Sequence, residues 1–340
     1  MTTFMAREIA ECGAVVERCL TENKAAFAAA AAELRARDPA VVVTNARGSS
    51  DHCALYLKYL IEIMVGLPCA SIGPSIASLY RAQLRLERGV AISLSQSGRS
   101  PDIVAAQRAA REGGALTLAL VNDESSPLAG EAARLIGLRA GEERSVAATK
   151  SMIAGMTAGA AVAAAWARDD AVAEALRRLP DALAAAAAPP EPVLASVADS
   201  KSAFVLGRGS TFAAAAEAAL KLKETCAIHA EAFSAAEVLH GPAEIIRPGF
   251  LVLAFPPRDE AAEGFGATLA KFSALGARVI TIESGAADAA DRLGAADAGH
   301  PLLAPIAMIH RFYPLAEAVA RRLGRDPDRP QNLRKVTETR

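Results

Sequence analysis

One short loop of the sequence, Leu94-Ser-Gln-Ser-Gly-Arg-Ser-Pro-Asp102, concentrates three serine hydroxyls around a glycine. An apolar run ends near Ser95, and Ser100 followed by Pro101 is a typical start of a helix. Hydroxyl groups and the free N–H groups of a helix N-terminus converge on an anion, and the helix dipole favours phosphate there. An ordinary capped turn carries similar residues, so the spacing favours phosphate binding only slightly.

A second turn of this kind is Arg47-Gly-Ser-Ser50, whose serines could hold another edge of a ligand or simply cap a helix. Its counterpart later in the chain is Arg208-Gly-Ser-Thr211. Where the first half has the serine loop, however, the second half has Phe255-Pro-Pro-Arg-Asp259, and proline removes N–H donors. We therefore expect phosphate binding only in the first half.

Ionisable side chains gather in the second half, around Glu224 and around His240. A carboxylate and an imidazole held near a sugar can act as general acid and base. Taken alone, however, Glu224 is more typical of a solvated helix residue and His240 of a turn or cap. No pair of His or Cys residues has metal-ligand spacing, and neither a GxSxG nor a P-loop pattern is present.

The elements that position these residues come as an internal repeat. The segment Val41–Ser50 resembles Ala203–Thr211, and two further strand patterns recur downstream, at offsets of 161, 160 and 162 residues. Each half alternates short apolar strands with helical stretches, which predicts parallel strands in a doubly wound sheet flanked by helices. A proline cluster at Ala185–Pro192 marks the seam.

Four parts of the chain follow from this pattern. We expect a helical segment of one or two packing helices at residues 1–35 and a first α/β unit at 36–186. A second unit follows at 187–323, and an extended, partly exposed tail at 324–340. The longest apolar run, Ser151–Ala167, is too short to span a membrane and is expected to be a helix buried against a sheet.

Composition narrows the class of protein. The 340 residues include 52% hydrophobic and only 4% aromatic residues, and their net charge of −1 gives no general attraction to nucleic acid or to membranes. The five cysteines are odd in number and form no CxxC pair, and acidic Glu8 and Glu11 interrupt any signal peptide. These features predict a soluble cytoplasmic protein without a disulfide framework.

Taken together, the motifs resemble those of the sugar isomerase (SIS) domain family, with two SIS units in tandem. They are similar to the isomerase portion of glucosamine-6-phosphate synthases and to stand-alone aminosugar-phosphate deaminases. The resemblance runs from about Glu8 to Thr337. It is carried, in order, by Ser95-Gln-Ser-Gly98, Val146-Ala-Ala-Thr-Lys150, Leu220-Lys-Leu-Lys-Glu224, Ile228-His-Ala-Glu-Ala232, His240-Gly-Pro242 and Asn332-Leu-Arg-Lys335.

The resemblance implies a role for each matching residue. The 6-phosphate would be held by Ser50, Ser95, Gln96, Ser97 and Ser100, and the sugar would lie along Ser49, Val146 and Ala148. The catalytic residues would be Glu224, His240 and Lys335. Glu224 would move a proton between C1 and C2, His240 would assist ring opening across a homodimer interface, and Lys335 would contact the carbonyl end of the sugar. This chemistry needs neither a metal nor an organic cofactor.

Departures from the synthase pattern indicate which branch of the family the sequence resembles. Only about forty residues precede the first expected strand, so we expect no glutamine-hydrolysing domain. Arg99 stands where the synthases have an acidic residue, Leu239 replaces a lysine and Gln331 an arginine, and one residue is missing after Lys335. Ser97–Asp102 and Ser145–Ser151 are more similar to the stand-alone deaminases.

We therefore expect an enzyme that converts glucosamine 6-phosphate to fructose 6-phosphate and ammonia. Two alternatives remain open: action on galactosamine 6-phosphate or an amino-acid-linked sugar phosphate, and a non-catalytic sugar-phosphate sensor. Sensors of this fold usually carry a DNA-binding helix-turn-helix, and the segment before the first strand shows neither that pattern nor a basic face.

Overall fold

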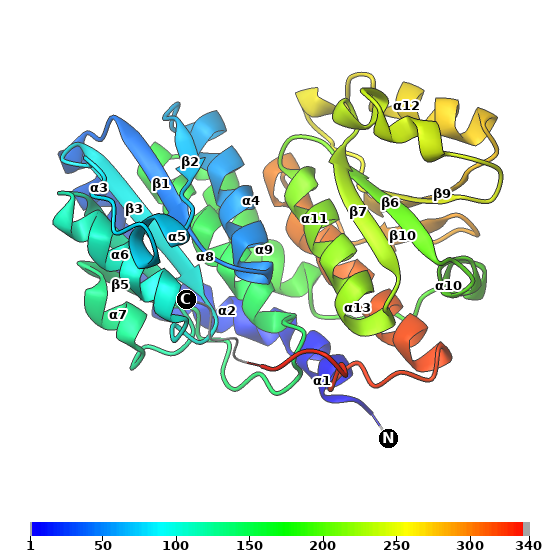
Figure 1. Cartoon of the computed structure of the whole chain (residues 1–340), viewed down its shortest axis with the longest axis horizontal. Coiled ribbons are helices and arrows are strands. Elements are labelled where there is room, and N and C mark those ends of the chain that lie inside the picture. Colours follow the sequence, from blue (N-terminus) through cyan, green and yellow to red (C-terminus); the bar gives the residue numbers. More distant parts are fainter. Residues whose placement is uncertain (1, 336–340) are drawn as a thin grey trace. The chain divides into compact units, whose positions relative to one another are not determined.

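The computed structural model describes residues 2–335, which form two five-stranded sheets flanked by helices (Figure 1). The strands of the first sheet are β1 (Val41–Asn45), β2 (Cys69–Ser71), β3 (Gly89–Ser95), β4 (Leu116–Val121) and β5 (Arg134–Gly137). Those of the second are β6 (Ser202–Gly207), β7 (His229–Ser234), β8 (Leu251–Ala254), β9 (Arg278–Ser284) and β10 (Arg292–Ala295).

The two sheets have the same topology. The first has the order β2-β1-β3-β4-β5, and the second, read from its far edge, has the order β7-β6-β8-β9-β10. Every described strand pair is parallel. Each strand thus occupies the place of its repeat counterpart, which confirms two doubly wound α/β units.

Helices pack beside each sheet. Those of the first half are α1 (Phe4–Ala10), α2 (Cys12–Glu22), α3 (Lys24–Arg37), α4 (Ser49–Met64), α5 (Ser75–Ser78), α6 (Pro101–Glu112), α7 (Pro127–Glu131), α8 (Lys150–Ala167) and α9 (Asp170–Ala182). Those of the second half are α10 (Glu191–Ala198), α11 (Thr211–Lys221), α12 (Phe265–Ala274) and α13 (Ala304–Arg322). Helices α3 and α4 pack against α8, and α10 and α11 pack against α13.

The contacts divide the described residues into two compact units. The first-sheet unit contains residues 14–143, 150–177 and 335, and the second-sheet unit contains 2–13, 144–149 and 178–334. Helix α1 and the short segment 144–149 therefore belong with the second sheet. The boundaries expected at residues 35, 186 and 323 stay predictions.

The structure adds detail where the sequence pattern was coarse. Three helices, rather than one or two, precede β1, because the helical path breaks at Glu11 and Asn23. The Asn23 amide donates to the carbonyls of Cys19 and Gly137, each at 2.8 Å. Helix α8 is almost wholly buried, as expected for its apolar run, and no helix among the described residues is long and apolar enough to cross a bilayer.

Candidate functional site

The serine loop joins β3 to α6 in the first-sheet unit. Strand β3 ends at Ser95, and α6 begins at Pro101 with Ser100 as its N-cap, as the sequence predicts. The Ser100 side chain makes no capping hydrogen bond, so its hydroxyl is not committed to the helix. Ser95, Gln96, Ser97 and Ser100 are all half-buried. The loop therefore offers hydroxyl, amide and N–H groups at the N-terminus of a twelve-residue helix.

Glycine is required at the turn of this loop. Gly98 has a φ of +62°, and a Cβ atom there would lie 2.1 Å from the hydroxyl oxygen of Ser126. The Gly98 N–H donates to Ser95 Oγ at 2.9 Å, and its carbonyl accepts from the N–H of Leu128 at 3.1 Å. A left-handed backbone and close packing therefore fix the curvature of the serine loop.

A partly buried ion pair links the serine loop to the neighbouring turn. The Arg47 guanidinium donates to Asp102 Oδ2 at 2.9 and 3.1 Å, and Asp102 lies fully buried in the first turn of α6. The next residues, Ser49 and Ser50, begin α4 and are half-buried. Since β1 and β3 are adjacent strands, their carboxyl ends bring these two turns to the same edge of the sheet.

The charge on Arg99 is already paired. Its guanidinium lies 2.7 Å from the carboxylate of Asp123, which follows β4. Hydrogen bonds from Ser125 and Arg99 hold the pKa of Asp123 below its usual value. Arg99 thus braces the outside of the serine loop against the next loop along the sheet.

Glu224 lies in the second-sheet unit, where α11 widens into a π-helical turn, η1 (Leu222–Cys226). Such turns occur frequently at functional sites. The turn ends at Ala227, which has a left-handed φ of 54°. About a fifth of the Glu224 side chain is exposed (21%), so the carboxylate is reachable from solvent.

A buried lysine fixes this carboxylate. Lys221, one turn earlier, contacts Glu224 Oε2 and also lies 3.2 Å from Glu217 Oε1. The Tyr313 hydroxyl donates to the same Glu217 oxygen at 3.4 Å. Burial by itself would lower the pKa of Lys221, but the two carboxylates outweigh it and raise that pKa. The lysine therefore stays charged and orients Glu224.

His240 and two of the three expected sugar-contacting residues, Val146 and Ala148, also lie in the second-sheet unit. His240 is exposed and follows the short 3-10 helix η2 (Glu237–Leu239), which packs against β7, as does η1. Val146 and Ala148 lie in the irregular segment 144–149 and are half-exposed.

Lys335 lies in the first-sheet unit, 3.3 Å from Glu143 Oε2. The Glu143 side chain is wholly buried and also accepts from the N–H and hydroxyl of Ser151, at 3.1 and 2.6 Å. A buried carboxylate thus anchors the lysine of the tail.

The structure therefore groups the expected residues in two sets. The first-sheet unit holds the expected phosphate ligands with Ser49 and Lys335, and the second-sheet unit holds Glu224, His240, Val146 and Ala148. Within residues 2–335, no group of three or more His, Cys, Asp or Glu side chains is arranged to hold a metal ion.

Three residues that hold the candidate site residues in place were not among the site residues expected from the sequence: Glu143, Glu217 and Lys221. Glu217 and Lys221 could have been found from their spacing to Glu224, since positions i, i+4 and i+7 share one helix face. Glu143 offers a weaker signal, a carboxylate just ahead of the Val146–Lys150 motif, because its partner Lys335 is distant in sequence.

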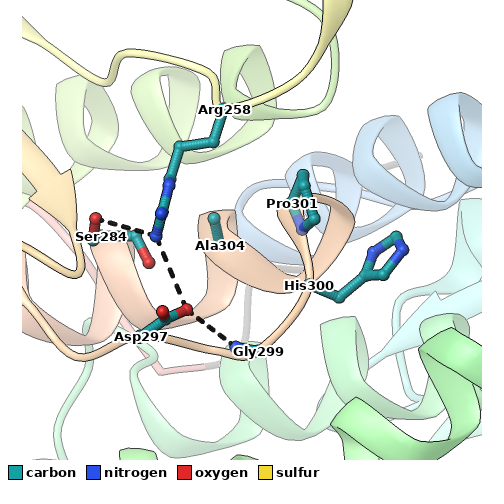
Figure 2. Close-up of a pocket in the computed structure, with 7 residues that line it drawn as sticks. All are labelled: Arg258, Ser284, Asp297, Gly299, His300, Pro301 and Ala304. Atoms are coloured by element: carbon teal, nitrogen blue, oxygen red, sulfur yellow. Dashed lines mark hydrogen bonds and ion pairs between the residues drawn. The ribbon is translucent and has the colours of Figure 1, made fainter.

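A separate cavity of about 180 Å³ lies at the carboxyl ends of the second sheet (Figure 2). Arg258 points into it, 3.5 Å from Asp297 Oδ1 and 3.2 Å from the Ser284 carbonyl oxygen. The carboxylate pairs the charge of Arg258, and none of the expected site residues lines the cavity. It is a weaker candidate for phosphate than the serine loop.

Comparison with known proteins identifies the family to which this fold belongs. The SIS domain model matches residues 24–165 and 196–308. The isomerizing glutamine–fructose-6-phosphate aminotransferase of Methanothermobacter thermautotrophicus is 34% identical over 298 residues, which cover 85% of this chain and 50% of that protein. The chain thus spans about half the length of the curated relatives it matches.

Two solved structures match nearly the whole chain. A protein of Silicibacter pomeroyi DSS-3, to which phosphosugar isomerase activity is ascribed, is 46% identical with a TM-score of 0.90, covering 96% of this chain and 100% of that one. Glucosamine-6-phosphate deaminase of Thermotoga maritima shares the fold at 19% identity, with a TM-score of 0.77 and coverage of 99% and 100%. On the family match and these relatives, the chain belongs to the SIS domain family.

Proposed function

We propose that this chain is an isomerising deaminase that converts glucosamine 6-phosphate and water to fructose 6-phosphate and ammonia. The observation that carries the proposal is the Glu224 carboxylate, which is partly exposed and fixed by the buried, charged Lys221. Isomerisation of an aldose needs one base that can take a proton from C2 and return it to C1.

Phosphate binding falls to the serine loop in this proposal. Ser95, Gln96, Ser97 and Ser100 stand at the N-terminus of α6, with Ser50 on the adjacent turn. Hydroxyl and N–H donors together with the helix dipole favour a dianionic phosphate without a cationic side chain. Binding energy from the phosphate then holds the reacting end of the sugar in place.

The proposed chemistry begins with ring opening, assisted by His240. Glu224 then takes the C2 proton of the open-chain aldehyde, and the electron pair forms an enolamine with the C1 oxygen protonated. Return of the proton to C1 gives a ketimine at C2. Water adds to the ketimine and ammonia leaves, so one water is consumed and one ammonia released. Lys335 would stabilise the developing negative charge on O1.

The relatives support an amino-sugar phosphate as the substrate class. The curated relatives are named for isomerisation coupled to amino transfer from glutamine, and the Thermotoga maritima neighbour, similar in fold alone, is named a deaminase. The segments 97–102 and 145–151 resemble the deaminase branch more closely, which favours release of ammonia.

The test is an assay of ammonia and ketose phosphate from glucosamine 6-phosphate and, separately, galactosamine 6-phosphate. Glu224→Gln should abolish turnover, whereas Glu263→Gln, which changes an exposed carboxylate of the same unit, should leave it unchanged. Ammonia from galactosamine 6-phosphate alone would correct the sugar. Absence of ammonia from both sugars would refute the proposal and favour an amino-acid-linked substrate or a sensor.

A further inference from the structure

Burial alternates along the irregular segment 144–149. Ser145, Ala147 and Thr149 are buried, whereas Val146 and Ala148 are half-exposed. Val146 and Ala148, two of the three residues expected to contact the sugar, are thus the partly exposed side chains of 145–149, and their position depends on what holds the backbone of this segment.

One anchor comes from helix α1. The Glu8 side chain is buried, and its carboxylate accepts hydrogen bonds from the N–H groups of Arg144 and Ser145, the latter at 3.3 Å from each oxygen. Hydrogen bonds to a buried charged acceptor are stronger than those between neutral groups. The Arg144 guanidinium also stacks on the ring of Phe4, 4.1 Å from its centroid.

A second anchor comes from Asp328, beyond α13. Its carbonyl oxygen accepts the N–H of Val146 at 3.2 Å. Its carboxylate accepts the N–H groups of Phe4 and Met5, both at 2.7 Å, at the start of α1. Residues 3–8, 144–146 and 328 thus form a three-segment clasp, which Thr3 further ties to Glu317 of α13 at 2.9 Å.

We propose that Glu8 and Asp328 are positioning residues that hold Val146 and Ala148 in place against the sugar; this inference rests on the proposed function. Neither side chain needs to touch the substrate. The clasp holds the backbone N–H groups of Arg144, Ser145 and Val146, and a displacement of about 1 Å at such a position is enough to lower turnover strongly.

The experiment compares Glu8→Ala, Glu8→Gln and Asp328→Ala with Glu11→Gln, which changes an exposed carboxylate just after α1. For each folded variant, kcat and KM are measured with glucosamine 6-phosphate, and the Kd of inorganic phosphate is measured by calorimetry. We expect kcat/KM of Glu8→Ala to fall at least about tenfold with phosphate affinity unchanged. Glu8→Gln keeps one acceptor oxygen and should recover part of the loss.

The two proposals fail in different ways. An inactive wild-type protein would refute the proposed deaminase. An active wild-type protein whose kcat/KM is unchanged in Glu8→Ala and Asp328→Ala would overturn the positioning role. A parallel loss of phosphate affinity would also overturn it, since that result means general damage. If Glu8→Ala does not fold, Glu8→Gln and Asp328→Ala decide the matter by the same measurements.

Discussion

The ammonium group of Lys221 lies 3.2 Å from the carboxylate of Glu217, and neither side chain is exposed to solvent. The same ammonium group contacts Glu224, the residue assigned to proton transfer. One buried cation thus neutralises a structural carboxylate and orients a second carboxylate that solvent can reach. Lys221 therefore links the buried packing of the second-sheet unit to the residue proposed for proton transfer.

Replacement of Lys221 by Met should destabilise the protein strongly. Glu217 would keep a buried charge without its cation, which costs about 3–5 kcal/mol in the free energy of unfolding. The double variant Glu217→Gln/Lys221→Met should recover much of that loss. Urea denaturation measures both, with Lys223→Met, at an exposed neighbouring position, as the control. Equal stability of the Lys221 and Lys223 variants would contradict the expectation.

Replacement of Gly98 by Ala should weaken phosphate binding. The new methyl group would lie 2.1 Å from the Ser126 hydroxyl oxygen, and a left-handed φ costs a non-glycine residue about 1–2 kcal/mol. Calorimetric titration with inorganic phosphate measures the effect. Gly130→Ala is the matched control, because a methyl group there meets no atom within 4 Å. Unchanged phosphate affinity in Gly98→Ala would place the phosphate elsewhere.

Stability should fall in acid because of His310. Burial lowers the pKa of this imidazole to about 4, with a smaller contribution from Arg311, and a hydrogen bond to the Ile9 carbonyl only partly opposes them. An unfolded histidine takes up a proton below pH 6.5, whereas the folded one stays neutral until about pH 4. The contribution of the neutral histidine to the free energy of unfolding is thus fully present above pH 6.5 and is lost as the pH falls from 6.5 to about 4.

The size of this effect can be measured by comparison with His310→Gln. When the pH falls from 7.5 to 5, the histidine should lower the free energy of unfolding by about 2 kcal/mol. Urea midpoints of the wild-type protein should therefore fall more steeply over that range than those of the variant. Parallel pH profiles would contradict this expectation, because they would mean that His310 takes up its proton at the same pH in the folded and the unfolded protein.

The expected role of His240 across a dimer can be tested by mixing subunits. Glu224→Gln and His240→Ala should each be inactive alone. If His240 serves the partner's site, random mixing after unfolding and refolding should restore about a quarter of wild-type turnover, because half the dimers then hold one complete site. Mixtures that stay inactive would place His240 in its own subunit's site.

Much of the fold follows from local pattern. Strand counterparts such as β1 and β6 were visible because each buried run ends in the same Arg-Gly-Ser turn. The start of α6 followed from Ser100 and Pro101, whose preferences are local. The number of helices before β1 was less clear, because the Asn23 amide bonds to Gly137, more than a hundred residues away.

The supporting shell of the site was harder to predict. The contact of Glu143 with Lys335 joins residues 192 apart in sequence, and no local pattern carries such a pairing. The resemblance to SIS proteins supplied roles for individual side chains such as Glu224. It gave no partner for Glu8, whose role emerges only from the hydrogen bonds to Arg144 and Ser145.

The bonds from Asp328 to Phe4 and Met5 also bear on how the chain is made. They join positions 324 and 323 residues apart, among the longest sequence separations in the structure. The ribosome releases α1 well before residue 328, so this helix cannot dock on Asp328 until more than three hundred further residues have been synthesised. The second-sheet unit should therefore close late, after the first sheet has formed, and α1 should stay open to chaperones and proteases during translation.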